Sequence, residues 1–123
     1  TNTILLSPFD STISHCDFKN CAGTIISCGN YAMVGEAEIS YCEFNNIKVT
    51  DDAPIILVSP SMEKYKRNKI VYCIFNDIVL HNGFLLKPGT CSYKLNRCTT
   101  EVLNCSFKNI STSRQDRKVS NRY

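Results

Sequence analysis

The sequence predicts an all-β fold, a solenoid of about four coils in which parallel strands stack on one another. Three observations predict it: a nine-residue pattern that occurs four times, alternation of apolar and polar residues inside that pattern, and a short apolar run after each copy. The chain has 123 residues, 43% of them hydrophobic, with a net charge of +3. This composition is ordinary for a folded domain and does not by itself indicate nucleic-acid binding.

The repeated pattern reads aliphatic-x-x-Cys-x-Phe-x-Asn/Asp-aliphatic. The four copies begin at Ile13, Ile39, Ile70 and Val102, and Cys21 takes the last aliphatic place in the first copy. Successive cysteines of the pattern are 26, 31 and 32 residues apart. Self-similarity at a nearly fixed period is the sequence signature of a repeat architecture.

The middle of each copy predicts a β-strand with one face inward. In the second copy, Cys42 and Phe44 alternate with more polar neighbours, which is the period-two pattern of a strand. Asn46 follows, and asparagine tolerates the left-handed backbone conformation of a tight turn. A strand is therefore expected to end at a sharp bend at this place in every copy.

A second short strand is expected in each coil. The apolar runs that predict it are Ile4–Leu6, Thr24–Ser27, Pro54–Val58 and Phe84–Leu86, each bounded by Gly, Pro, Asn or Asp. The repeating unit is then strand, tight bend, strand and variable loop. We expect the loops to absorb the differences in coil length, so that strands at equal places pair in register.

Stacking at about 4.8 Å per coil places equal residues in columns. The columns are Cys16, Cys42, Cys73 and Cys105; Phe18, Phe44, Phe75 and Phe107; and, at the bend, Asn20, Asn46, Asp77 and Asn109. Each buried phenylalanine is expected to contribute roughly 2 to 3 kcal/mol. The bend residues are expected to hydrogen-bond from coil to coil, as side-chain amides do in stacked sheets.

These copies resemble coils of a right-handed parallel β-helix of the pectin-lyase-like kind. The Cys-x-Phe-x-Asn rhythm is similar to the Phe-x-x-Asn repeats of polymorphic outer-membrane-protein-like surface proteins. Here Phe and Asn are two residues apart, and the Gly-Gly-Ala-Ile motif of that family is absent. The resemblance covers roughly residues 1–110. It implies about four coils, which we expect to be a segment of a longer helix.

The remaining residues, 111–123, carry Arg114, Arg117, Lys118 and Arg122 with almost no apolar side chain. They are expected to form a basic polar tail, cap or linker. Asn104 and Asn109 match the acceptor rule for N-glycosylation, although Asn109 also falls at the expected bend.

Eight cysteines suggest a disulfide scaffold at first, but four of them share one place in the repeat. A repeated place favours small buried thiols packed on their own kind. Cys91 and Cys98 form a candidate loop disulfide if the chain is secreted. Their spacing, like that of Cys21 and Cys28, does not fit a zinc site. No metal and no cofactor are expected.

Two sets of side chains are candidate binding residues. His15, Tyr41 and Tyr72 share an outward place and would form an exposed aromatic strip, which can stack on sugars, contact a protein or only pack across coils. Lys64, Lys66, Arg67 and Lys69 form a basic stretch that suits phosphate, glycan or acidic protein, or is simply a solvated loop.

The acidic residues give a weaker signal for catalysis. Asp17 and Glu43 occupy equal outward places about 5 Å apart and could hold a cation or act as acid and base. They are equally well two surface carboxylates, because Ile74 and Ser106 take this place in the other copies. Asp51 and Asp52 form an isolated acidic pair in a turn. No Ser-His-Asp or Cys-His arrangement can be argued.

Three functions follow as hypotheses. The favoured one is a non-catalytic β-helix segment for surface display or assembly, in contact with protein or glycan. The others are part of a carbohydrate-active lyase or hydrolase, and an intracellular scaffold in a filament or large complex. We expect a protein partner or a stacked copy to cover the ends of the helix, and no nucleic acid or membrane span. The expected location is extracellular or the cell surface, with a cytoplasmic assembly as the alternative.

Overall fold

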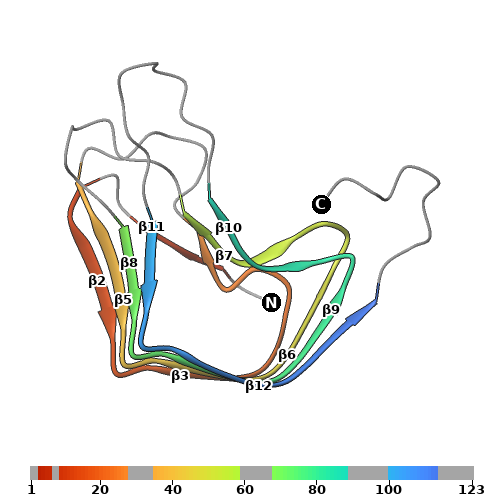
Figure 1. Ribbon diagram of the computed structural model, residues 1–123. Coiled ribbons are helices and arrows are strands. Elements are labelled where there is room, and N and C mark those ends of the chain that lie inside the picture. The colour runs from red at the N-terminus through yellow and green to blue at the C-terminus, as the bar shows by residue number, and fades with distance from the viewer. Residues whose placement is uncertain (1–2, 7–8, 28–34, 59–67, 89–99, 114–123) are drawn as a thin grey trace.

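The computed structural model describes residues 3–6, 9–27, 35–58, 68–88 and 100–113 (Figure 1). These residues form twelve strands and no helix. The strands are β1 (Ile4–Leu5), β2 (Ser11–Ser14), β3 (Asp17–Ala22), β4 (Ile26–Ser27), β5 (Ala37–Ser40), β6 (Glu43–Thr50), β7 (Pro54–Val58), β8 (Asn68–Val71), β9 (Ile74–His81), β10 (Phe84–Pro88), β11 (Thr100–Leu103) and β12 (Ser106–Ser113).

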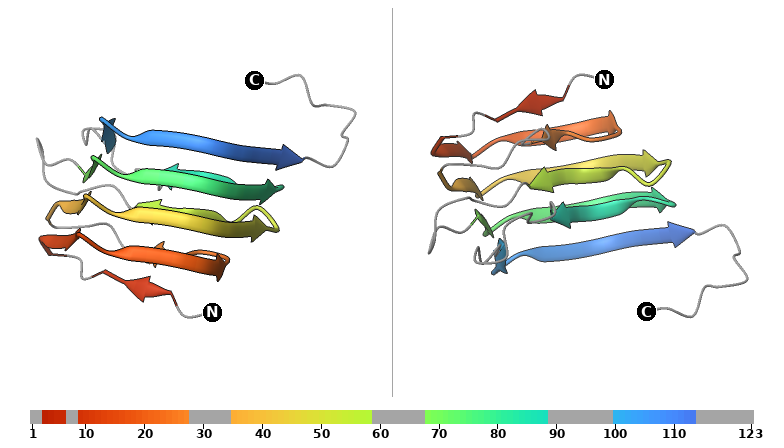
Figure 2. Two further views of the ribbon diagram at one scale, coloured as in Figure 1. Left: turned by 90° about the horizontal axis from the view of Figure 1, so that it is seen from below. Right: turned by 90° about the horizontal axis from the view of Figure 1, so that it is seen from above.

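Three parallel sheets of four strands each run along the stack. Sheet A has the order β1-β4-β7-β10, sheet B has β2-β5-β8-β11, and sheet C has β3-β6-β9-β12. Figure 1 looks along the stack, with sheet B on the left and sheet C below, and Figure 2 shows the coils lying one over another. This architecture confirms the expected all-β parallel solenoid of about four coils.

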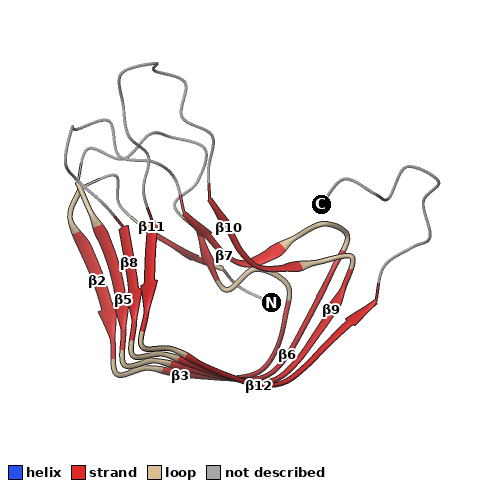
Figure 3. Cartoon of the chain, in the orientation of Figure 1, coloured by secondary structure: helices blue, strands red, loops and turns tan. Residues whose placement is uncertain are grey.

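Each coil contains three strands, so the expectation of two was wrong. The nine-residue pattern is divided between sheets B and C at His15, Tyr41, Tyr72 and Asn104, which have φ values of 56, 53, 54 and 55°. Figure 3 shows these corners as loops between the strands. A left-handed residue reverses the alternation, which is why Ile39 and Cys42 both face inward although they are three positions apart.

The bend at the Asn/Asp place lies inside a strand rather than at its end. Asn46 has φ 55°, yet β6 continues from Glu43 to Thr50. The inward residues Phe44 and Ile47 are again three positions apart, so a second left-handed residue resets the alternation. The strands of sheet C are therefore bent, and they are longer than those of sheet B: β6, β9 and β12 have eight residues and β3 has six, against four in each strand of sheet B.

The register places equal residues over one another. Phe18 pairs with Phe44, Phe44 with Phe75, and Phe75 with Phe107. Their rings stack with centroids 5.0, 4.7 and 5.2 Å apart. Burial depends on position in the stack, because the inner rings of Phe44 and Phe75 are 0% and 3% exposed and Phe107 at the end is 48% exposed.

Loops outside the sheets do not absorb all the differences in coil length. Ile26, Ile56 and Leu86 are equivalent in sheet A. They lie 10, 14 and 13 residues after Cys16, Cys42 and Cys73 of the preceding coils, so the corner that follows sheet C is shorter after the first coil than after the second and third. In the second coil the longer corner contains Asp51 and Asp52, both with positive φ.

The strands of the stack extend past residue 110, where the expected coils ended. Strand β12 extends to Ser113 because Ser111, Thr112 and Ser113 pair with Val79, Leu80 and His81 of β9. Residues 114–123, including the basic residues of the expected tail, lie outside the described residues.

Candidate functional site

The most distinctive lateral feature is a ladder of aromatic rings at the corner between sheets B and C. His15 and Tyr41 stack with centroids 5.0 Å apart and planes 8° apart, and Tyr41 and Tyr72 stack at 5.0 Å and 5°. Tyr41 and Tyr72 are each about half exposed, at 52% and 50%. We call His15, Tyr41 and Tyr72 the aromatic ladder.

Ring stacking limits what the aromatic ladder can bind. The faces of neighbouring rings lie against each other, so the ladder presents to the side ring edges and phenol hydroxyl groups. Only the outer face of His15 and the face of Tyr72 toward the fourth coil are not stacked on another ring. Edges and hydroxyls suit edge-to-face contacts and hydrogen bonds better than the broad face that a sugar ring stacks on.

The corner itself does not require aromatic side chains. A left-handed conformation costs a bulky residue roughly 1 to 2 kcal/mol, and asparagine tolerates it better. Asn104 makes the equivalent corner in the fourth coil with φ 55°. Ring stacking offsets about 0.5 to 1.5 kcal/mol of this conformational cost for each pair of rings. The aromatic residues are therefore best explained by the surface that they form.

Charged side chains on the outer face of sheet B alternate in sign. Glu38 pairs in register with Lys69, and Lys69 with Glu101. Lys69 Nζ also lies 4.0 Å from Glu36 Oε2. Lys69, the last residue of the expected basic stretch, therefore lies among carboxylates. Lys64, Lys66 and Arg67 lie outside the described residues.

The acidic pair expected on sheet C is brought together. Asp17 and Glu43 are register partners, and Ile74 and Ser106 follow in the same column. Asp51 and Asp52 are exposed at a turn, where the Thr50 hydroxyl donates to Asp51 Oδ2 at 3.3 Å. Among the described residues, no group of three or more His, Cys, Asp or Glu side chains could hold a metal ion.

The cysteine column is a chain of thiols that donate to backbone carbonyls. Cys42 Sγ donates to Ser40 O at 3.3 Å and to Ile13 O of the preceding coil at 3.7 Å. Cys73 makes the equivalent contacts with Val71 O at 3.4 Å and Ile39 O at 3.5 Å. Cys16, Cys21, Cys42, Cys73 and Cys105 are all free thiols. Cys91, Cys98 and Cys28 lie outside the part that the structure describes.

Burial makes the inner thiols poor nucleophiles. It raises the pKa of Cys42, and it raises the pKa of Cys73 from 9.0 to about 12. The thiolate is the reactive form, so these two side chains are structural rather than catalytic. Cys21 pairs with Ile47 and takes an aliphatic place in the column.

The raised pKa of Cys73 predicts an alkaline loss of stability. Below pH 9 the thiol is protonated in both states and has no effect on the pH dependence. Between pH 9 and about 12 the unfolded chain releases this proton and the folded chain keeps it, so the free energy of unfolding should fall as pH rises. Urea unfolding at several pH values checks this. The fall should be smaller in Cys73→Ala and unchanged in Val79→Ala, which removes an exposed side chain that does not titrate; equal falls in all three proteins would contradict it.

The amide ladder changes column at the third coil. Asn46 Nδ2 donates to Asn20 Oδ1 at 2.7 Å, as the repeat predicts. Asp77 occupies the next rung, and an ionised carboxylate has no hydrogen to donate to Asn46. One residue earlier in the chain, Asn76 Nδ2 donates to Asn45 Oδ1 at 3.0 Å. Asn109, which is back in the column of Asn46 and Asp77, donates from Nδ2 to Asn76 Oδ1 at 3.3 Å.

His81, the last residue of β9, lies beside the last strand. Its Nδ1 is 2.6 Å from Ser113 Oγ. This contact joins β9 to β12 across residues that are register partners. Ser113 falls within the expected tail, so the contact depends on the extension of β12 beyond residue 110.

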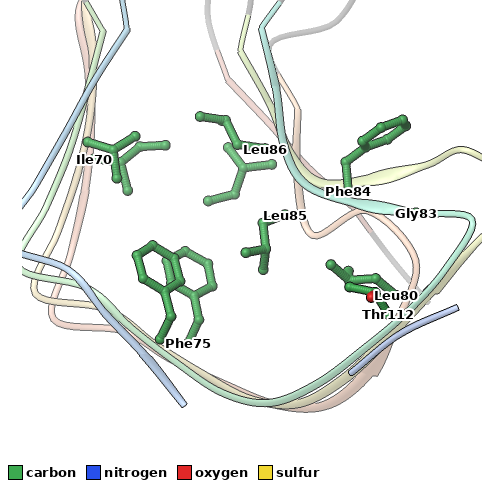
Figure 4. Close-up of a pocket in the computed structure, with 11 residues that line it drawn as sticks. Ile70, Phe75, Leu80, Gly83, Phe84, Leu85, Leu86 and Thr112 are labelled. Atoms are coloured by element: carbon green, nitrogen blue, oxygen red, sulfur yellow. The ribbon is translucent and has the colours of Figure 1, made fainter. Parts of the chain in front are cut away.

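An apolar cavity of about 540 Å³ opens at the C-terminal end of the stack (Figure 4). Ile70, Phe75, Leu80, Leu85 and Leu86 point into the space between the three sheets, and Thr112 lies at its edge. Val102 and Phe107 of the fourth coil complete this wall. No titratable side chain lines the cavity, so its described lining contains no acid, base or nucleophile for catalysis.

No protein-family model matches the sequence, and a search of the curated proteins finds no match. Among the described residues there is no helix of the length and hydrophobicity needed to cross a membrane. The fold and the exposed side chains are therefore the basis for a functional proposal.

Proposed function

We propose that the chain is a non-catalytic β-helix segment that acts as a rigid scaffold and displays its lateral surface to a protein partner. The aromatic ladder carries this proposal. It concentrates three stacked rings on one exposed corner, at a backbone conformation that does not call for them. Exposed, rigid aromatic side chains are the residues that most often dominate the energetics of protein interfaces.

The composition of the core is consistent with a role as a scaffold. The inward-facing residues are mainly columns of phenylalanine, cysteine and aliphatic side chains, which stabilise the stack. The buried polar residues of the described part, Ser27, Ser40 and Asn68, include no acid, base or nucleophilic thiol. A pectin-lyase-like relationship and a place at the cell surface or in an intracellular assembly are parts of the same proposal. They are supported by the three parallel sheets and the resemblance of the repeat, and the thiols favour a reducing compartment.

Site-specific photo-crosslinking tests the proposal. A photoreactive phenylalanine analogue at Tyr72 should crosslink to a protein in the native source, and the same analogue at Val79 should not. Val79 lies on β9 and is 42% exposed, so it samples the same coil on another part of the surface. The crosslinked protein is then identified and purified for binding measurements.

With the purified partner, the double variant Tyr41→Ser/Tyr72→Ser should bind at least about tenfold more weakly. The double variant Lys48→Ser/Val79→Ser, on exposed places of sheet C, should bind as the parent does. Equal affinity of all three proteins would contradict the proposed role of the ladder. Thermal melting confirms that each variant is folded.

The carbohydrate-active alternative has its own observation, the register pairing of Asp17 with Glu43. Turnover of a polysaccharide that is lost in Asp17→Asn or Glu43→Gln would overturn the non-catalytic proposal. Glycan binding abolished by Tyr41→Ala would replace the protein partner with a carbohydrate. We expect neither result.

A further inference from the structure

Among the described residues, the first-coil strands β1, β2 and β3 and the fourth-coil strands β10, β11 and β12 each pair along one edge only, and both ends carry exposed apolar side chains. At the N-terminal end, Ile4 and Leu5 of β1 are 41% and 75% exposed. At the C-terminal end, Val102 and Phe107 are 41% and 48% exposed and border the apolar cavity. Unpaired strand edges of this kind are templates for pairing with another strand.

The strands at the N-terminal end correspond one to one with the strands at the C-terminal end. The coils are complete, because each of the three sheets has four strands and the first and last strands of every sheet belong to the first and fourth coils. A second copy set on the C-terminal end would place its β1, β2 and β3 over β10, β11 and β12. All three sheets would then continue without a gap in register.

The same residue types would meet at such a junction as meet inside the chain. The columns within the chain join Phe75 to Phe107, Ile70 to Val102, and Ile56 to Leu86. Continued by one step, they place Phe18, Ile13 and Ile4 of the second copy over Phe107, Val102 and Leu86. These three apolar side chains would cover the cavity at the end of the core.

The polar columns are compatible with this junction, with one exception. Ser106 would meet Asp17, Glu101 would meet Thr12, and Asn104 would meet His15 of the second copy. Lys108, however, occupies the column of Lys19 and would lie about 5 Å from it. This like-charge pair weakens the contact at low salt, because both side chains are exposed.

Residues 114–123 are a poor substitute for a second copy. They contain one aliphatic residue, Val119, one aromatic residue, Tyr123, and four basic ones. An apolar cavity of this size is filled favourably by aliphatic and aromatic side chains, and burying unpaired charges in it would be costly.

From this match we infer that copies of this chain stack head to tail, with the N-terminal coil of one covering the apolar C-terminal end of the next. The contact is heterologous and does not close on itself, so it generates linear assemblies whose length depends on concentration. This inference is independent of the lateral aromatic ladder, which stays exposed along the sides of such an assembly.

Sedimentation velocity of the 123-residue chain over a range of concentrations tests the inference. The parent should form a growing series of oligomers. Phe107→Lys removes the competent C-terminal end and Phe18→Lys the competent N-terminal end, so each variant alone should be monomeric. An equimolar mixture should form a dimer and nothing larger, because each partner then offers one intact end.

The result that would overturn the inference is a parent that stays monomeric at all concentrations. Oligomers of Phe18→Lys alone would also overturn it, because they would show tail-to-tail association. Val102→Lys and Ile4→Lys form a second pair for the mixing experiment if a phenylalanine variant does not fold. Ile74→Lys is the control and should assemble as the parent does, because Ile74 is 38% exposed on the side of the third coil and is in register with Glu43.

Two further measurements are specific for this orientation. Cys16 and Cys105 lie three coils apart within a chain, about 14 Å, which is too far for a disulfide. Mild oxidation should therefore give a linked Cys16–Cys105 peptide in oligomers and not in monomers. Lys108→Glu should tighten assembly roughly two- to fivefold at low salt, because it faces Lys19 of the next copy. Cys105–Cys105 links in place of Cys16–Cys105 links would contradict head-to-tail stacking.

Discussion

Replacing Phe44 with alanine is expected to destabilise the protein by about 3 to 5 kcal/mol, enough to unfold most of the chain. The ring is 0% exposed and lies between the rings of Phe18 and Phe75, with centroids 5.0 and 4.7 Å away. Its removal leaves a cavity and breaks two stacking contacts at once. Neighbouring coils cannot close this cavity, because their backbone hydrogen bonds fix the distance between rungs.

Urea unfolding followed by far-UV circular dichroism measures this effect, with Phe107→Ala as the matched control. Phe107 belongs to the same column but is 48% exposed and stacks on one ring only. Its replacement should cost about 1 kcal/mol at concentrations where the chain is monomeric. If Phe44→Ala and Phe107→Ala had equal effects, burial in the column would not be the source of stability.

Replacing Gly35 with alanine is expected to cost about 3 kcal/mol, although only one methyl group is added. The new Cβ would lie 2.5 Å from the backbone nitrogen of Asp10 and 2.8 Å from the carbonyl carbon of Phe9. Backbone atoms cannot move aside as a flexible side chain does. The first and second coils would have to separate at a place where Glu36 N donates to Asp10 Oδ1 at 2.9 Å and Ser11 N to Glu36 O at 3.0 Å.

The control is Gly23→Asn, measured by the same urea titration. Gly23 has φ +85° and no atom within 4 Å of an added Cβ. Asparagine tolerates this conformation, so the loss should be a few tenths of a kcal/mol. A Gly35→Ala protein as stable as Gly23→Asn would show that the first coil is not held closely against the second.

The repeat predicted the stacking well because stacking depends on residue type at equal places. Phe18, Phe44, Phe75 and Phe107 could be aligned from the sequence, since a column of buried rings needs a large apolar residue once per coil. The three-residue steps from Ile39 to Cys42 and from Phe44 to Ile47 also indicate in the sequence where the chain turns a corner. Strict period two cannot produce these steps, so a break in the alternation must lie between the two inward positions, and here a left-handed residue makes it.

The candidate site was less predictable. His15, Tyr41 and Tyr72 were expected on one exposed strip, but the orientation of the rings depends on the corner conformation and decides that their faces are covered. The amide ladder changes column because Asp77 cannot donate a hydrogen to Asn46. This could not be predicted before the structure showed which side chains lie beside Asp77. The register partner of His81 required the true end of β12.

By itself, the sequence determined the solenoid, the number of coils and the columns of its core, because a repeated pattern has to place equal side chains in equal surroundings. Only the tertiary structure decided that each coil has three sides, that the aromatic ladder presents edges, and that the apolar cavity lies open at one end. These properties depend on backbone direction at single left-handed residues and on which coil is last. Residue type alone specifies neither.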